Sequence, residues 1–172
     1  MSLDEVEAAV SQYHCRNLVV TGGEPLVQQG PLATLVERLK RRRFWIEVET
    51  NCTLVPEQRL VSLVDHWSVS PKLENSGNTL PARENARAYR LFRKLPSANF
   101  KYVVEKADDL PEVRALTDRY EIPPSKVVLM PQARDTDALL ERSSWLVDLC
   151  KSEGYAFSTR LQVLLWGNRR GV

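Results

Sequence analysis

Short apolar runs alternate with amphipathic stretches along almost the whole chain of 172 residues. The runs have the length and the β-branched content of buried strands, whereas the stretches between them carry apolar residues at helical spacing. The expected strands cover 18–20, 44–50, 66–69, 100–104 and 127–130, and the expected helices cover 2–14, 31–43, 56–64, 83–95, 110–120 and 136–152. Strands that alternate with helices indicate a parallel sheet with helices outside it, of either the barrel or the doubly wound type.

Polar residues follow several of the expected strands at the point where each strand ends. Gly22-Gly23-Glu24, Glu49-Thr50-Asn51 and Ser70-Pro71-Lys72 come after the first three strands, and Pro131-Gln132 closes the fifth. Ligands of parallel sheets bind outside the carboxyl ends of the strands. We therefore expect these residues to gather at one mouth of the fold.

The turn after the first strand, Thr21 to Pro25, has the chemistry of a small-molecule site. Its two glycines carry no Cβ atom, so a ligand could lie directly on the backbone. Glu24 places a carboxylate beside the open amides, and such a turn could bind both the ammonium and the carboxylate of an amino acid. The alternative is an ordinary strand-to-helix turn with a solvated glutamate, and these residues alone do not decide between the two.

The composition bounds the class of protein. An apolar fraction of 43% and a charged fraction of 27% are ordinary for a globular protein, and 172 residues fit one domain over 1–172. A net charge of +2 does not call for a nucleic-acid partner, and no apolar run approaches the roughly 20 residues that span a bilayer. We expect a cytoplasmic protein without nucleic-acid or membrane partners. The basic run 40–43 fits a solvated helix end, with an RNA-binding patch as the alternative.

The three cysteines, Cys15, Cys52 and Cys150, are far apart in the sequence. This number and spacing suit reduced thiols rather than a disulfide framework. A [4Fe-4S] cluster needs several thiolates that converge on one small site, and no two of these cysteines are close enough to form a cluster loop. We expect Cys15 and Cys52 to be small buried apolar residues.

The chain resembles 7-carboxy-7-deazaguanine synthase, a radical S-adenosylmethionine (SAM) enzyme of the queuosine pathway. Its Gly22-Gly23-Glu24-Pro25 is similar to the GGEP motif of radical SAM enzymes. Further similar stretches run in family order almost to the last residue. They are 20–26, 49–51, 68–72, 100–104, 130–132 and 161–168.

The resemblance implies a fold and a set of site residues. The fold would be a trimmed, partial (β/α)6 radical-SAM-type barrel, here without its first strand. Cofactor-binding positions would come from three of the motifs: Gly22, Gly23 and Glu24 would hold the methionine end of SAM, Ser70, Pro71 and Lys72 would line the rest of that cofactor, and Met130, Pro131, Gln132 and Ala133 would border its adenine. Thr21 and the terminal carboxylate of Val172 would contact the substrate.

The resemblance also implies a reaction. The family rearranges 6-carboxy-5,6,7,8-tetrahydropterin to 7-carboxy-7-deazaguanine with loss of ammonia, using SAM, a [4Fe-4S] cluster and Mg²⁺, and it forms homodimers. The cluster cysteines and the magnesium-binding threonine of the family have no counterpart in this sequence, so we expect this chain alone to be inactive. The alternatives are a non-catalytic remnant that binds a ligand or a partner, and a different radical SAM activase.

Three further expectations concern the edges of the fold. Without a preceding strand, the strand at 18–20 would form an open sheet edge, to be paired by a partner chain or by a longer native protein. Residues 74–84 are predicted to form a polar loop that could act as a lid. The apolar run 161–166 is predicted to be a final strand that pins the chain end against the core.

Overall fold

The computed structural model describes residues 1–167 and 169 of the chain. Six parallel strands form one sheet in the order β1-β2-β3-β4-β5-β6, which is also their order in the chain. The strands are β1 (Asn17–Val20), β2 (Trp45–Thr50), β3 (His66–Val69), β4 (Ala98–Val104), β5 (Val127–Pro131) and β6 (Ala156–Phe157). Every strand predicted from the apolar runs between 18 and 130 is therefore present.

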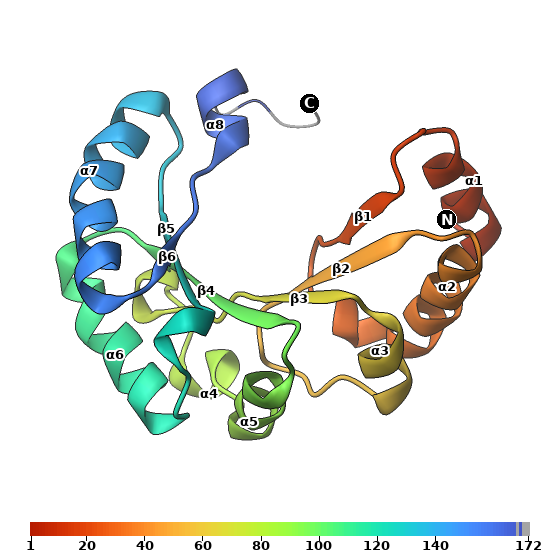
Figure 1. The fold of residues 1–172 in the computed structure, drawn as a ribbon, viewed down its shortest axis with the longest axis horizontal. Helices are drawn as coiled ribbons and strands as arrows, with labels where there is room; N and C mark the ends of the chain where they lie inside the picture. Colours follow the sequence, from red (N-terminus) through yellow and green to blue (C-terminus); the bar gives the residue numbers. More distant parts are fainter. Residues whose placement is uncertain (168, 170–172) are drawn as a thin grey trace.

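Helices lie in the segments between the strands, and one further helix precedes the first strand and another follows the last. They are α1 (Leu3–Ser11), α2 (Gln29–Arg41), α3 (Gln58–Leu63), α4 (Leu80–Arg83), α5 (Ala86–Lys94), α6 (Leu110–Arg119), α7 (Thr136–Glu153) and α8 (Leu161–Trp166). In Figure 1, α1 to α3 and α5 to α7 lie around the outside of the curved sheet. The predicted helix over 2–14 begins as expected, because Ser2 and Glu5 form a reciprocal capping box.

The period-2 alternation of the strands separates an apolar face from a polar one. On the helix side, Ile46, Val48, Trp67, Phe100 and Tyr102 are fully buried and form the centre of the core. On the opposite side, strand register places residues of β2, β3, β4 and β5 in rows, most of them partly exposed and Ser68 buried. These include Glu47 beside His66, Glu49 beside Ser68, Lys101 beside Val128, and Val103 beside Met130. The concave side of the sheet is thus the side that carries polar chemistry.

The sheet does not close on itself. β1 pairs only with β2, and β6 pairs only with β5, so the described residues form an open half-barrel (Figure 1). This agrees with the predicted partial barrel and with the predicted open edge at β1. Val19, on that edge, is 52% exposed.

The last apolar run was predicted wrongly. Residues 161–166 form α8 and not a strand, and most of their apolar side chains face solvent, among them Leu165 and Trp166. A six-residue apolar run does not by itself distinguish a strand from a helix. The run therefore does not pin the chain end as a sheet strand would.

Residues 74–84 are also more ordered than an irregular loop. They contain a 3₁₀ turn (Glu74–Ser76) and α4. The Asn75 amide donates to Asp109 Oδ2 at 2.7 Å, and Arg83, which is buried, forms an ion pair with Glu112. These contacts tie the segment to the start of α6.

The basic end of α2 is largely neutralised by neighbouring carboxylates. Lys40 Nζ lies 2.6 Å from Asp65 Oδ1, and Arg42 Nη1 lies 3.2 Å from Glu7 Oε1. Paired cations of this kind favour a structural helix end over an RNA-binding patch.

Across the residues that the structure describes, none of the helices combines the length and apolar character that crossing a membrane requires.

Candidate functional site

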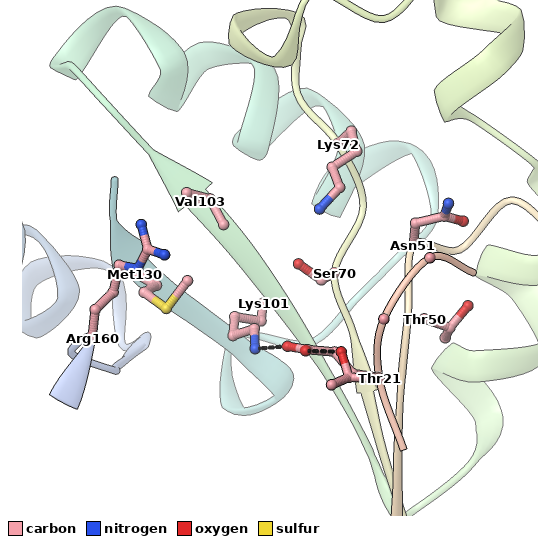
Figure 2. Close-up of a pocket in the computed structure, with 12 residues that line it drawn as sticks. Thr21, Thr50, Asn51, Ser70, Lys72, Lys101, Val103, Met130 and Arg160 are labelled. Atoms are coloured by element: carbon pink, nitrogen blue, oxygen red, sulfur yellow. Dashed lines mark hydrogen bonds and ion pairs between the residues drawn. The ribbon is translucent and has the colours of Figure 1, made fainter. Parts of the chain in front are cut away.

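A cavity of about 420 Å³ lies at the carboxyl ends of the strands, on the concave side of the sheet (Figure 2). We call it the central cavity. Six of its lining residues were predicted from the sequence and come from three separate motifs: Thr21, Gly22, Gly23, Ser70, Lys72 and Met130. Strand topology alone brings these segments together, because parallel strands end at the same edge of the sheet.

Six further lining residues were given no cofactor or substrate role by the family resemblance: Glu49, Thr50, Asn51, Lys101, Val103 and Arg160. Glu49, Thr50 and Asn51 were nevertheless expected at this mouth, because they form one of the polar strand ends. The position of Lys101 opposite Phe100 in its strand was also a usable signal. Arg160 follows β6 and has no pattern around it that points to a ligand.

Glu49 is the centre of the polar network in this cavity. The Thr21 hydroxyl donates to Glu49 Oε2 at 2.8 Å, and the Lys101 ammonium forms an ion pair with Glu49 Oε1 (Figure 2). Burial opposes ionisation of Glu49, but the hydrogen bonds from Lys101 and Thr21 outweigh it, so the pKa of this carboxyl lies below its ordinary value. Glu49 is therefore a carboxylate at neutral pH, and it links the ends of β1 and β2 to the middle of β4.

The glycine turn leaves its backbone open to the cavity. Gly22 has φ of +119°, a conformation that side-chain-bearing residues rarely adopt. A Cβ atom built on Gly22 or Gly23 would meet no atom within 4 Å. Within the described chain, neither glycine amide donates a backbone hydrogen bond in a turn or loop. The turn therefore offers free donors beside open space.

Glu24 is held by three protein donors. Its Oε1 accepts from Leu26 N at 3.0 Å and from Thr50 Oγ1 at 2.9 Å, and its Oε2 accepts from Asn51 N at 2.7 Å. The side chain thus fastens the glycine turn to the end of β2, which a solvated glutamate would not do. A carboxylate has about four lone-pair positions, so one acceptor position, on Oε2, remains for a ligand.

The other predicted cofactor positions lie in cavities that adjoin the central one. Glu24 lines a cavity of about 360 Å³ that shares Thr21 and Gly23 with the central cavity. Pro71 and Gln132 line one of about 390 Å³ that shares Lys72 and Val103 with it. The predicted site thus forms a continuous row along one mouth of the half-barrel.

Hydrogen bonds from two arginines hold the segment that follows β5. Gln132 Oε1 accepts from Arg142 Nη1 at 2.6 Å, and Ala133, which is buried, accepts from Arg160 Nη1 at 2.6 Å through its carbonyl. Ala133 lines a cavity of about 320 Å³ that shares Arg160 with the central cavity, whereas Pro131 lines none of these cavities. The remaining predicted substrate contact, the terminal carboxylate of Val172, lies outside the described residues.

The cysteines do not form a cluster site. Cys52 and Cys150 are buried, which confirms the expectation for Cys52. Cys15 is exposed, so the expectation that it would be buried was wrong. Burial raises the pKa of the Cys52 thiol and keeps it protonated. Among the described residues, no three His, Cys, Asp or Glu side chains could hold a metal ion together.

Comparison with solved structures supports the fold. QueE from Escherichia coli matches with a TM-score of 0.67 at 22% identity, over 93% of this chain and 64% of that one. A domain of pyruvate-formate lyase-activating enzyme from Bacteroides vulgatus matches with a TM-score of 0.59 at 11% identity. The predicted partial (β/α)6 barrel of the radical SAM type is confirmed.

Sequence comparison identifies the family. No protein-family model matches the chain. A 7-carboxy-7-deazaguanine synthase from Pyrobaculum aerophilum is 34% identical over 99% of this chain and 75% of its own length, and one from Rhodopirellula baltica is 31% identical over 99% and 69%. At this identity and coverage, the chain belongs to the 7-carboxy-7-deazaguanine synthase family.

Proposed function

We propose that this chain supplies the SAM-binding and substrate-binding surface of a 7-carboxy-7-deazaguanine synthase. The substrate would be 6-carboxy-5,6,7,8-tetrahydropterin, which loses ammonia as it is rearranged. One observation carries the proposal: a single cavity at the strand ends is lined by Thr21, Gly22, Gly23, Ser70, Lys72 and Met130, which the family resemblance assigns to these two ligands.

The residues present fit SAM. The methionine ammonium needs an acceptor, and Glu24 Oε2 has one position left beside the open glycine turn. The methionine carboxylate needs donors, and the glycine amides and the Lys72 ammonium can supply them. SAM held by these residues would be the source of the radical that removes a hydrogen atom from the substrate, although the three separate cysteines of this chain do not fit the cluster that would supply the electron.

The same cavity suits a flat, polar ring. Thr21 and Glu49 lie at the end of β1 and β2, with Lys101 across from them on β4. Glu49 offers acceptor positions to ring N–H groups, and the Thr21 hydroxyl, itself positioned by Glu49, can accept from a donor on the ring. Val103 and Met130 supply apolar contact at the side of the cavity.

We also propose that this chain by itself lacks the ligands for two parts of the family's chemistry, the [4Fe-4S] cluster and Mg²⁺. The three cysteines are at separate places, so they do not fit a cluster, and the described His, Cys, Asp and Glu side chains form no metal site. We accordingly expect the chain by itself to bind its ligands without turnover. Homodimer formation, a magnesium requirement and a cytoplasmic location remain part of the proposal, by analogy with the family.

A second candidate is a non-catalytic binding protein, which the scattered cysteines favour. This candidate predicts the same cavity but does not require that the pterin bind in it. A different radical SAM activase is disfavoured, because the likeness to the activating-enzyme domain is 11% in identity, whereas the synthases match at 31–34% over 99% of the chain.

The test is calorimetric titration of the chain with SAM and, separately, with 6-carboxypterin as a stable analogue of the substrate. The synthase proposal expects both ligands to bind. Lys72→Met is expected to lower the affinity for SAM on the order of 10-fold, which is typical for the loss of a hydrogen bond to a charged group. Lys94→Met, on the exposed face of α5, is the matched control. Binding of SAM without the pterin would favour the second candidate, and binding of neither would refute both.

A further inference from the structure

The central cavity carries more positive than negative charge. Three cationic side chains line it, Lys72, Lys101 and Arg160, against the single carboxylate of Glu49. Lys101 is already paired with Glu49. In the part of the chain that the structure describes, neither Lys72 nor Arg160 has a carboxylate within ion-pair distance. The cavity is therefore built for a ligand that brings negative charge.

Arg160 is held in place without being neutralised. Its Nη1 donates to the Ala133 carbonyl at 2.6 Å, which fixes the guanidinium next to the end of β5. Its Nε is buried and meets no acceptor among the described atoms. Arg160 lines both the central cavity and the adjoining one of about 320 Å³, whose other charged lining residues, Arg134 and Arg169, are also cations.

The place of Arg160 separates it from the glycine turn. In Figure 2, its guanidinium lies beside Met130, across the cavity from Thr21 and Asn51, whereas Lys72 lies on the side of Ser70 and Asn51. The two uncompensated cations are thus at different ends of the site. A planar guanidinium with free N–H groups matches the geometry of a carboxylate, to which it can donate two parallel hydrogen bonds.

We propose that Arg160 binds the carboxylate of a ligand in the central cavity and so fixes that ligand at the β5 side of the mouth. This inference rests on the proposed function and deepens it. Both ligands of that function carry a carboxylate, one on the methionine of SAM and one on the pterin ring. Lys72, on the side of Ser70 and Asn51, would bind the carboxylate of one ligand, and Arg160 would bind the carboxylate of the other.

Two pairs of probes test the assignment. SAM is compared with decarboxylated SAM by calorimetry, and 6-carboxypterin is compared with pterin by fluorescence titration. The proteins are the wild-type chain, Arg160→Gln and Arg160→Lys. Arg87→Gln, an equal loss of charge on an exposed position of α5, is the control. Thermal unfolding of each variant separates a loss of the Ala133 contact from a loss of binding.

Arg160→Gln is expected to weaken one carboxylate-bearing probe on the order of 10- to 100-fold, as when a hydrogen bond between charged groups is lost. Its carboxylate-free counterpart should bind as before, and Arg160→Lys should keep part of the affinity. A selective loss in the pterin pair assigns Arg160 to the substrate, and one in the SAM pair assigns it to the cofactor.

Equal weakening of both members of each pair, or no weakening, would overturn the inference and leave Arg160 as a support for Ala133. That outcome is distinct from a failure of the proposed function. If the wild-type chain binds none of the four probes, the proposed function is wrong, and the inference falls with it.

Discussion

The Lys101 ammonium lies against the Glu49 carboxylate across the concave face of the sheet. These residues belong to β4 and β2, which do not pair with each other, because β3 lies between them. The contact therefore bridges the floor of the central cavity. Since Thr21 donates to the other oxygen of Glu49, three strands are joined through one carboxylate.

Lys101→Met is expected to raise the pKa of Glu49 and to destabilise the chain by about 1–2 kcal/mol at pH 7, between the values for exposed and buried ion pairs. Burial alone would raise that pKa, and Lys101 is the largest opposing cause. The pKa of Glu49 in the folded chain can be measured by carbon-detected NMR titration, and stability by urea unfolding.

The pH dependence of this effect has a defined sign. A folded-state pKa below the ordinary value stabilises the fold above the unfolded-state pKa, and the stabilisation is lost as pH falls through the folded-state value. The stability difference between wild type and Lys101→Met should therefore be largest above the ordinary value of 4.5 and shrink at lower pH. A difference that does not change with pH, or one matched by Lys94→Met, would contradict the role given to Glu49.

Glu24→Gln is expected to lose stability by about 1–3 kcal/mol, because an amide cannot accept from all three donors that the carboxylate satisfies. If the free position on Oε2 also binds the ammonium of SAM, the calorimetric SAM signal should disappear in the same variant. Glu57→Gln, at an exposed position, is the control for both measurements. A destabilised variant that binds SAM normally would show that Glu24 only fastens the turn.

Most of the fold could be predicted from the sequence because each element carries its own signal. The apolar runs of β1 to β5 and the helical spacing between them are local, and the right-handed parallel arrangement follows from their alternation. The glycine turn was also local, since Gly22 and Gly23 mark a strand end by themselves. Strand ends of a parallel sheet share one edge, so Ser70 and Lys72 were expected at the cavity, whereas Met130 was implied only by the family resemblance.

What could not be predicted depends on contacts between distant segments. Pairing of Glu49 with Lys101 requires the register of β2, β3 and β4, which no single segment encodes. Arg160 reaches the cavity only because β6 adds beside β5. The run 161–166 was assigned to a strand because a short apolar run fits either period, and the chain instead forms a helix there, of which Val163 is the buried residue.

The different exposure of the three cysteines can be tested by the reactivity of their thiols. One thiol per folded chain, Cys15, should react rapidly with an aromatic disulfide reagent, and Cys52 and Cys150 should react only on unfolding, because they are buried and burial raises the pKa of both thiols. Cys15→Ser should remove the fast phase. Anaerobic incubation with iron and sulfide should give no stoichiometric [4Fe-4S] spectrum, and the appearance of one would contradict the assignment of the three cysteines.

The open edge at β1 predicts self-association through that strand. Unpaired backbone groups on an exposed edge bind further strands unless a charge or a covering element prevents it. Val19, 52% exposed on β1, is the place to introduce a charge, and Val27, 75% exposed but outside the sheet, is the matched control. Sedimentation velocity should show concentration-dependent association of the wild-type chain and of Val27→Lys, and a monomer for Val19→Lys. A wild-type chain that stays monomeric, or two variants that behave alike, would mean that the edge is already protected by the twist and shortness of a four-residue strand.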